Sequence, residues 1–221
     1  MTRSASRLMV AGLEKIPRTK AYLIRLSDGS RVKALGDDVA RLGICEGTEV
    51  EQHVLKEASE GYEAAKARAM AMRLLRTRPR TEYELRRSLR EKGVAARTLD
   101  MLIADLKAGG HVDDRLFAKL WIKEKIAGGN SGRVRIARDL ATKGIARETA
   151  EEELARDYDR RAELEIAKRL ALRRLSRLTS LGVETRRRRV YNLLVRRGFG
   201  YETASAALRW ALDASGGDSI E

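Results

Sequence analysis

Arginine side chains are the residues of this chain best suited to binding chemistry. Lys and Arg number 46 against 32 Asp and Glu, which gives the 221 residues a net charge of +14. The planar guanidinium group forms paired hydrogen bonds with phosphate or carboxylate oxygens. This charge predicts salt-dependent attraction to a polyanion such as nucleic acid. A basic surface with no polyanionic partner is the alternative interpretation.

The candidate contact residues form three groups along the chain. Four consecutive arginines on a helix point in all directions, so we expect only some of the third group to share a side, such as Arg186 and Arg189 with Arg196 and Arg197. A solvated face is the alternative for this group. The candidates are Arg73, Arg76, Arg80, Arg86, Arg87 and Arg90, then Arg133 and Arg135, then Arg173, Arg174, Arg177, Arg186, Arg189, Arg196 and Arg197.

Residues suited to catalysis or metal binding are scarce. His53, His111 and Cys45 are scattered and do not have the spacing of metal ligands. We interpret Asp113-Asp114 as a helix cap rather than an acid pair. The sequence therefore predicts no catalytic centre, metal or cofactor.

The glycine-rich loop from Gly128 to Arg133 is a candidate phosphate cradle. It lacks the Lys-Ser/Thr ending of a nucleotide-binding loop, and no strand is expected before it. We interpret it as a flexible interhelical loop with a helix starting near Ser131. In the alternative, its amides together with Arg133 and Arg135 bind a phosphate or a partner carboxylate.

A repeat organises the chain from Tyr62 onward. Its three copies align on Gly93, Gly144 and Gly198, which are 51 and 54 residues apart. Relative to each glycine, apolar residues recur at positions −8, −4, +1 and +10, and a threonine recurs at +5. Agreement at five positions in three copies indicates a true internal repeat.

Each copy reads as three helices. Apolar residues at −8 and −4 share one helix face, and glycine suits the left-handed position that ends that helix. A preceding helix is expected over residues 62–77, 115–127 and 162–179, and Trp121 and Trp210 are expected in the core. The fold class predicted is all-α, with three tandem three-helix repeats in an elongated, curved arrangement and a small N-terminal β-hairpin segment. A compact nine-helix bundle is the alternative.

The first 61 residues differ from the rest. Asp28-Gly29 lies between two alternating runs, which predicts a hairpin over residues 22–35, and a short helix from Asp37 should stop at Gly43. We expect a small, flexibly joined accessory unit. The domains predicted are residues 1–61, 62–113, 114–158 and 159–221.

Basic charge concentrates in the third repeat. Residues 62–113 carry 12 basic and 7 acidic side chains, residues 114–157 carry 10 and 8, and residues 161–213 carry 13 and 5. The single cysteine indicates a reducing compartment. No window approaches the ~20 apolar residues of a membrane span, and the start lacks a secretory apolar stretch, so we expect a cytoplasmic protein.

The sequence resembles the RecX family. The resemblance rests on the run from Arg76 to Leu85, on Leu89-Arg90-Glu91-Lys92-Gly93, and on Gly110-His111-Val112-Asp113-Asp114-Arg115-Leu116-Phe117-Ala118 with Trp121. It continues through Gly132, Arg135-Ile136, Leu140 and Lys143-Gly144-Ile145, and it covers residues 62–157 well and the third repeat more weakly. The arginine-rich region 180–189 departs from the pattern.

This resemblance implies a regulator, mainly an inhibitor, of RecA-mediated homologous recombination and the damage (SOS) response. Such proteins bind in the groove of the RecA–DNA filament and suppress ATP hydrolysis and strand exchange. The partners implied are the RecA filament and, weakly and with salt dependence, single- or double-stranded DNA, with no membrane and a monomeric chain. The alternatives are a tandem helix-turn-helix DNA-binding protein and a helical scaffold for another acidic protein. An enzyme is the least favoured class.

Overall fold

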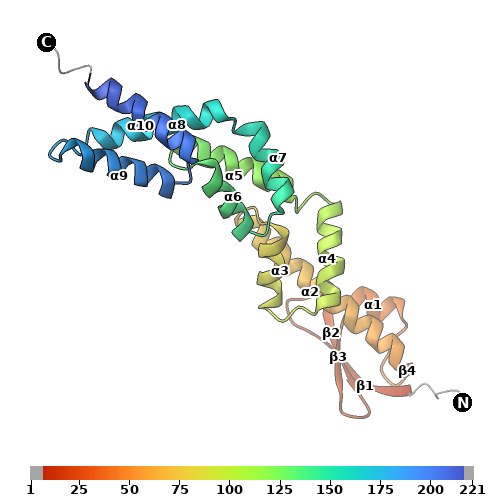
Figure 1. Ribbon diagram of the computed structural model, residues 1–221. Coiled ribbons are helices and arrows are strands. Elements are labelled where there is room, and N and C mark those ends of the chain that lie inside the picture. Colours follow the sequence, from red (N-terminus) through yellow and green to blue (C-terminus); the bar gives the residue numbers. More distant parts are fainter. Residues whose placement is uncertain (1–6, 217–221) are drawn as a thin grey trace, which may run out of the picture. The chain divides into compact units, whose positions relative to one another are not determined.

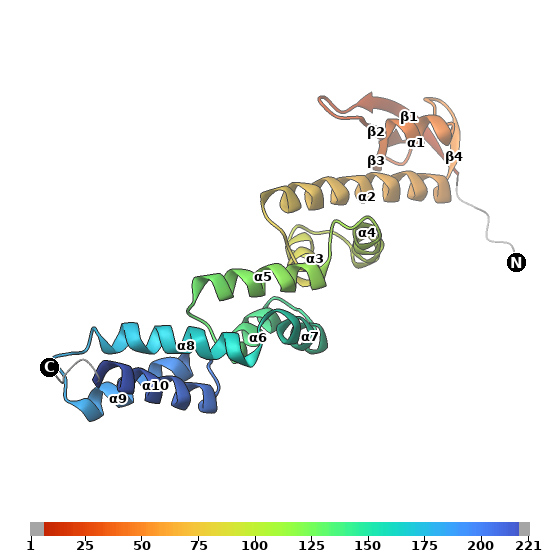
Figure 2. The ribbon, with the colours of Figure 1, turned by 90° about the horizontal axis from the view of Figure 1, so that it is seen from above.

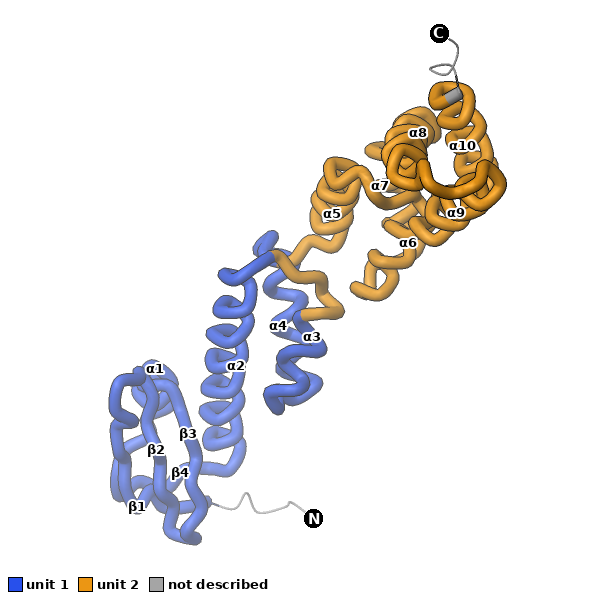
Figure 3. The backbone as a smooth tube through the Cα atoms, turned by 90° about the vertical axis from the view of Figure 1, so that its left-hand side faces the viewer, with its two compact units in different colours: residues 1–78, 85–111 blue, residues 79–84, 112–221 orange. Residues whose placement is uncertain are grey.

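The computed structural model describes residues 7–216, which contain four strands and ten helices (Figure 1). Helix α1 lies between the third and fourth strands, and the other helices follow the fourth strand. The chain divides into two compact units (Figure 3). One comprises residues 1–78 and 85–111, and the other comprises residues 79–84 and 112–221.

The N-terminal strands form one antiparallel sheet in the order β3-β2-β1-β4. The predicted hairpin is confirmed as β2 and β3, in which Ile24 pairs with Val32 and Gly29 takes a φ of +84° at the turn. The sequence did not predict the two other strands. The strands are β1 (Arg7–Lys15), β2 (Ala21–Leu26), β3 (Arg31–Leu35) and β4 (Glu49–Glu51).

The sheet is packed against helices on one face. The short helix α1 (Gly36–Arg41) ends before Gly43, as predicted. Helix α2 (Gln52–Thr77) begins ten residues before the expected start at Tyr62, and its Leu55 and Ala58 belong to the core of the sheet. The expectation of a flexible joint at residue 61 is therefore wrong, because a continuous helix passes through that position.

In the part of the chain that the structure describes, nine helices form the three predicted three-helix repeats. The first repeat contains α2, α3 (Glu82–Arg90) and α4 (Ala96–Ala108). The second contains α5 (Asp114–Gly128), α6 (Arg133–Thr142) and α7 (Arg147–Asp157), and the third contains α8 (Arg160–Leu175), α9 (Val183–Arg196) and α10 (Tyr201–Gly216). The elongated, curved arrangement and the domain boundaries stay predictions.

The repeat positions have the roles that their residue types predict. Gly93, Gly144 and Gly198 have φ values of +82°, +79° and +84°, so each ends its helix in the left-handed conformation. The residues at −8 and −4 are all fully buried: Leu85, Leu89, Ile136, Leu140, Val190 and Leu194. The second and third repeats share one apolar core, which extends from Phe117 to Ala211.

The junction between these two repeats is a close backbone contact. The Gly132 and Val134 amides at the start of α6 donate to the carbonyls of Arg197 and Gly198, over 2.9 and 3.1 Å. A β-carbon on Gly132 would overlap the Gly198 backbone, and one on Gly198 would overlap Arg135. Glycine is needed at both positions because the two backbone segments lie so close together that no side chain fits between them.

The start of α3 makes the equivalent junction with the turn between α6 and α7. The Thr81 hydroxyl donates to the Lys143 carbonyl over 2.6 Å, and Tyr83 covers Gly144 so closely that a β-carbon there would overlap it. Thr81 and Gly132 both lie twelve residues before their repeat glycine. The two junctions therefore use the same positions of the repeat.

Replacing Gly198 by alanine should destabilise the protein more than replacing Gly93. The φ values of the two residues are both left-handed, +84° and +82°, and this conformation costs an L-residue about 1–2 kcal/mol. Only at Gly198 would the added β-carbon overlap a neighbouring backbone segment, that of Arg135. Overpacking should add about 1–3 kcal/mol to Gly198→Ala. Urea unfolding followed by far-ultraviolet circular dichroism measures the difference, and equal losses would contradict the junction.

Candidate nucleic-acid and protein interface

Three of the predicted arginines line one groove between α8 and α9. Arg174 comes from α8, and Arg189 and Arg196 come from α9. The groove has a volume of about 540 Å³, and none of the described residues that line it is acidic. We call it the Arg174 groove, and its lining residues are Arg174, Arg189, Asn192, Leu193, Val195 and Arg196.

Helical periodicity brings these residues together. Val190 and Leu194 bury one face of α9, so residues 189, 192 and 196 fall on the neighbouring face. Helices α8, α9 and α10 pack side by side (Figures 1 and 2), and this places Arg174 opposite that face. Asn192 was missed from the sequence, although its spacing of three from Arg189 and four from Arg196 was a usable signal.

The guanidinium groups of the three arginines in this groove are available to bind a partner. Within residues 7–216, no carboxylate forms an ion pair with Arg174, Arg189 or Arg196, and all three are exposed. Each guanidinium presents five N–H donors in a rigid fork. The groove is therefore able to hold phosphate or carboxylate oxygens from two sides.

The other candidates of the third repeat lie elsewhere. Arg173 lines a separate groove of about 660 Å³ beside the end of α5, and Arg177 is exposed just after α8. Arg186 is half-buried, and its Nε atom is buried without a hydrogen-bond partner among the described residues. Arg197 lines a smaller cleft together with Arg135. Of the four arginines expected on one side, only Arg189 and Arg196 line the same groove.

The candidates of the first group show a mixture of exposure and pairing. Arg86 pairs with Asp100, and Arg87 donates to Glu91 over 3.0 Å. These ion pairs reduce the charge that the two arginines offer to a partner. Arg73, Arg76 and Arg90 are exposed, and Arg80 is half-buried.

Arg133 is bonded within the protein. Its guanidinium donates to the carbonyls of Leu154 and Tyr158 at the end of α7, the first over 2.9 Å, and its amide donates to the buried Glu163 carboxylate over 2.8 Å. Glu163 therefore caps the first amide of α6, which begins at Arg133, two residues after the expected start near Ser131. The amides of residues 132–134 all have protein acceptors, which argues against a phosphate cradle.

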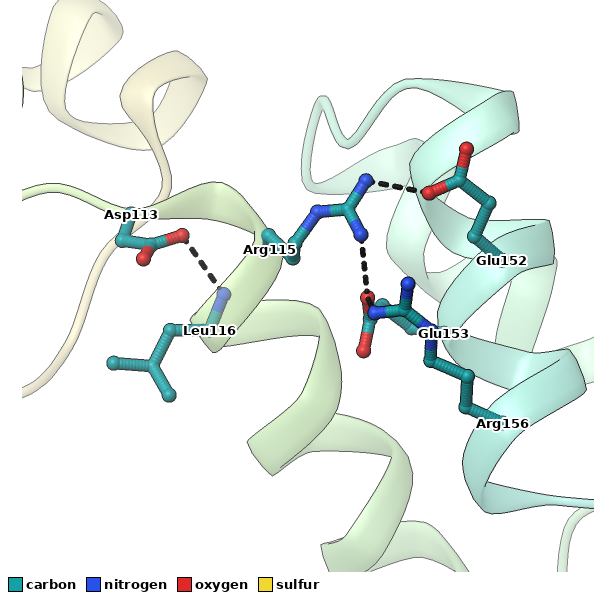
Figure 4. Close-up of polar contacts among 6 residues, drawn as sticks. All are labelled: Asp113, Arg115, Leu116, Glu152, Glu153 and Arg156. Carbon is teal, nitrogen blue, oxygen red and sulfur yellow. Dashed lines mark hydrogen bonds and ion pairs between the residues drawn. The ribbon is translucent and has the colours of Figure 1, made fainter.

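Asp113 and Asp114 are caps, as predicted, although for two different helices. Asp113 accepts from the Leu116 amide at the start of α5 over 2.9 Å (Figure 4), whereas Asp114 accepts from the Glu82 amide at the start of α3 over 2.8 Å. A carboxylate at a helix N-terminus satisfies a free amide and meets the positive end of the helix dipole. Asp114 and Glu163 thus perform the same task at the two junctions.

A buried carboxylate joins α5 to α7. Glu153 is 3% exposed and accepts from Arg115 over 3.1 Å and from Arg156 over 3.0 Å (Figure 4). Arg115 also donates a hydrogen bond to Glu152. This hydrogen bond is the main reason why the pKa of Arg115 is raised above its ordinary value. Two cations compensate the cost of burying one charge.

The two tryptophans differ in environment. Trp121 is half-buried against the core, stacks on Phe117 and lies beneath the ammonium groups of Lys125 and Lys143, at 4.1 and 4.5 Å from its ring. Trp210 is 42% exposed, with Lys168 over its ring. The expectation that Trp210 lies in the core is wrong, because α10 turns this residue toward solvent.

His53, His111 and Cys45 are exposed and do not come together. In the part of the chain that the structure describes, no cluster of His, Cys, Asp or Glu is suited to a metal ion. No helix in that part has the length and hydrophobicity to cross a membrane.

Comparison with known proteins places the three repeats in a family. Sequence models of the first, second and third three-helix domains of RecX match residues 67–106, 113–154 and 162–208. The regulatory protein RecX of Amycolatopsis mediterranei is 32% identical over 154 residues, which cover 70% of this chain and 87% of that protein. The chain belongs to the RecX family.

Other RecX relatives extend the match. The regulatory protein RecX of Streptococcus sanguinis is 22% identical over 200 residues, which cover 90% of this chain and 76% of that protein. A crystal structure of regulatory protein RecX has the same fold, with a TM-score of 0.71 at 22% identity over 90% of this chain and 97% of that one. RecX from Lactobacillus salivarius gives a TM-score of 0.63 at 20% identity, over 68% and 97%.

Replacing Glu153 by glutamine should lower the stability of the α5–α7 contact. The amide cannot satisfy both guanidinium groups, and we expect a loss of about 1–3 kcal/mol. Glu151→Gln is the matched control, because Glu151 forms only an exposed pair with Arg147 on the same helix and should cost less than about 0.5 kcal/mol. Urea midpoints compare the two, and equal values would contradict the role of Glu153.

Alkaline pH should weaken the protein through Tyr158. Burial first, then the Glu163 charge, raises the pKa of its hydroxyl above the ordinary value of 10.0. The folded state therefore holds this proton longer, so its stabilisation is complete below pH 10 and is lost as pH rises beyond it. Tyr158→Phe should lose the hydrogen bond to the Ser131 carbonyl but show a shallower alkaline decline in unfolding midpoint. An unchanged decline would contradict this assignment.

Proposed function

We propose that this chain regulates RecA in homologous recombination by binding the RecA–DNA filament and suppressing its ATP hydrolysis and strand exchange. The observation that carries the proposal is the Arg174 groove, an exposed cationic groove on the most basic repeat of a RecX-family chain. The relatives named above are called regulatory proteins. The chain would act by occupancy rather than by catalysis.

The filament suits this surface for electrostatic reasons. DNA phosphates or acidic side chains of the filament would enter between Arg174 on one wall and Arg189 and Arg196 on the other. DNA contact alone would be weak and would fall as salt rises. Three related repeats on a single chain allow several weak contacts to act together through effective concentration.

Inhibition follows from restraint of the polymer. A chain bound across neighbouring RecA subunits would hinder the movements that accompany ATP turnover, or would occupy the space of the second DNA strand. It would do so as a cytoplasmic monomer without a cofactor. Ligand binding shifts an equilibrium only through differential affinity, so the chain should bind the inhibited filament state more tightly than the active one.

The tandem helix-turn-helix interpretation is less well supported. In that geometry the helix after the glycine turn enters the major groove with its N-terminal residues. Helix α7 instead carries Glu148, Glu151 and Glu152, and α10 begins with exposed Tyr201 and Glu202. Carboxylates at these places would repel DNA phosphate. A scaffold for another acidic protein stays a second alternative, which pull-down with and without nuclease separates from DNA bridging.

The direct test is the DNA-dependent ATPase of RecA measured against increasing amounts of this protein. We expect a progressive fall in the rate at fixed RecA and single-stranded DNA. Raising the salt concentration should shift the inhibition curve to higher protein concentration, because the contacts are electrostatic. An ATPase rate that stays constant at equimolar protein would reject the proposal.

The Arg174 groove is tested by charge replacement. Arg174→Gln, Arg189→Gln and Arg196→Gln together should raise the half-inhibitory concentration at least about tenfold, which corresponds to ~1.4 kcal/mol of binding. The matched control is Arg187→Gln, Arg188→Gln and Arg209→Gln, which removes the same charge from a different groove, between α9 and α10. Equal effects of the two triple variants would show that only total charge matters.

Charge variants are better suited to this question than truncation. The sequence alone suggests removing residues 158–221, with a large loss of inhibition expected. The structure adds that residues 117–154 share their core with α8, α9 and α10, so truncation would expose apolar surface and disturb the second repeat. Surface substitutions leave that core intact.

A further inference from the structure

Each of the two inter-repeat junctions has a receiving surface with the same parts. A turn carbonyl accepts a hydrogen bond from the incoming helix start, at Lys143 or Arg197. The next residue is a left-handed glycine that leaves room for the incoming chain. A carboxylate from the preceding helix of the same repeat, Asp114 or Glu163, caps the first amide of the incoming helix.

The first repeat has the corresponding residues, but within residues 7–216 no helix is seated on them. Gly93 has the same left-handed φ, and a β-carbon added there would meet no atom within 4 Å. Lys92 aligns with Lys143, and Glu63 aligns with Asp114, since each lies thirty residues before its glycine. Burial supports this alignment. Ala67 and Ala71 are buried in α2, and the residues at the same positions of α5, Ala118 and Ile122, are buried as well.

We propose that this surface, here called the Gly93 seat and formed by Glu63, Lys66, Lys92 and Gly93, binds the N-terminal end of an α-helix from a different protein. The incoming helix has Ser, Thr or Gly at its N-cap and a carboxylate in its first turn. The proposal does not rest on RecA as the partner, since it follows from the junctions within this chain.

Charge decides the chemistry of the incoming helix. At the α3 junction, the Lys143 ammonium holds the Glu84 carboxylate at 3.0 Å. In the Gly93 seat, Lys92 takes the place of Lys143, and Lys66 stands where the second repeat has Phe117. Lys66 pairs with Glu63 at 3.2 Å while both side chains remain about half exposed. A first-turn carboxylate would therefore meet two ammonium groups.

A second copy of this chain does not supply the occupant. The starts of α3 and α6 are already seated within their own chain. Helix α9 begins a turn earlier, so the Arg186 amide bonds to the Gly182 carbonyl inside the helix. In addition, Arg189 stands at the position of Glu84 and would face Lys92. Helix α9 also has Gly182 as its N-cap and Glu184 in its first turn, but Arg186 to Arg189 follow directly and would meet Lys66 and Lys92. The first-turn carboxylate of α10, Glu202, is paired with Arg160 of its own chain. The occupant is therefore a helix of another protein.

The start of α3 itself is a suitable probe, because its contacts with an equivalent surface are known. A peptide of residues 80–91, with Arg87→Lys joined to Glu91 as a lactam to hold the helix, is titrated into ¹⁵N-labelled full-length protein. We expect chemical-shift changes at Gly93, Lys92 and Glu63. The Glu84→Arg peptide should bind at least about tenfold more weakly.

Two glycine variants make the test specific. Gly93→Asn keeps the left-handed conformation, which asparagine tolerates, but fills the seat, and it should abolish the shifts. Gly110→Asn is the control, since Gly110 also has a positive φ and open surroundings, and it should leave them unchanged. The proposal is overturned if the peptide moves no resonance of the seat at millimolar concentration, moves Gly144 instead, or binds Gly93→Asn equally well.

Discussion

The close approach of backbone to backbone at the repeat glycines is the constraint on which the second and third repeats depend. At Gly144 and Gly198 a turn in the left-handed conformation presents a carbonyl to the start of a helix in the preceding repeat. Even one methyl group at either glycine would push the two backbone segments apart. At Gly198 these hydrogen bonds, and not only apolar contacts, join the second and third repeats, so the register of one on the other is fixed.

Within residues 7–216, the arginine-rich segment before Gly198 does not make the junction that its counterparts make. The model of the third RecX domain matches through this segment. In α3 and α6, the positions nine to twelve residues before the glycine make a junction with the following repeat. The corresponding positions of α9, residues 186–189, are all arginine, and among the described residues the Arg186 amide bonds to the Gly182 carbonyl of its own helix. This segment also contributes Arg189 to the Arg174 groove.

The sequence predicted those features that have a local signal. Helix faces, glycine turns, the β2–β3 hairpin and the Asp113 cap all follow from spacings of a few residues. Strand β4 is only three residues long, and the start of α2 has no side-chain cap. Neither the strand nor this helix start therefore has a recognisable sequence signal. The partners of Arg133 lie 21 to 30 residues away. Similarly, periodicity identified the basic faces of α8 and α9, but only their packing selects the arginines that share a groove.

Electron cryo-microscopy of this protein bound to a RecA–DNA filament tests the central claim most directly. The account predicts that the third repeat contacts the filament and that Arg174, Arg189 and Arg196 lie within hydrogen-bond distance of DNA phosphates or acidic side chains. A filament whose bound chain turns that groove to solvent, with the contacts made by another face, would contradict it.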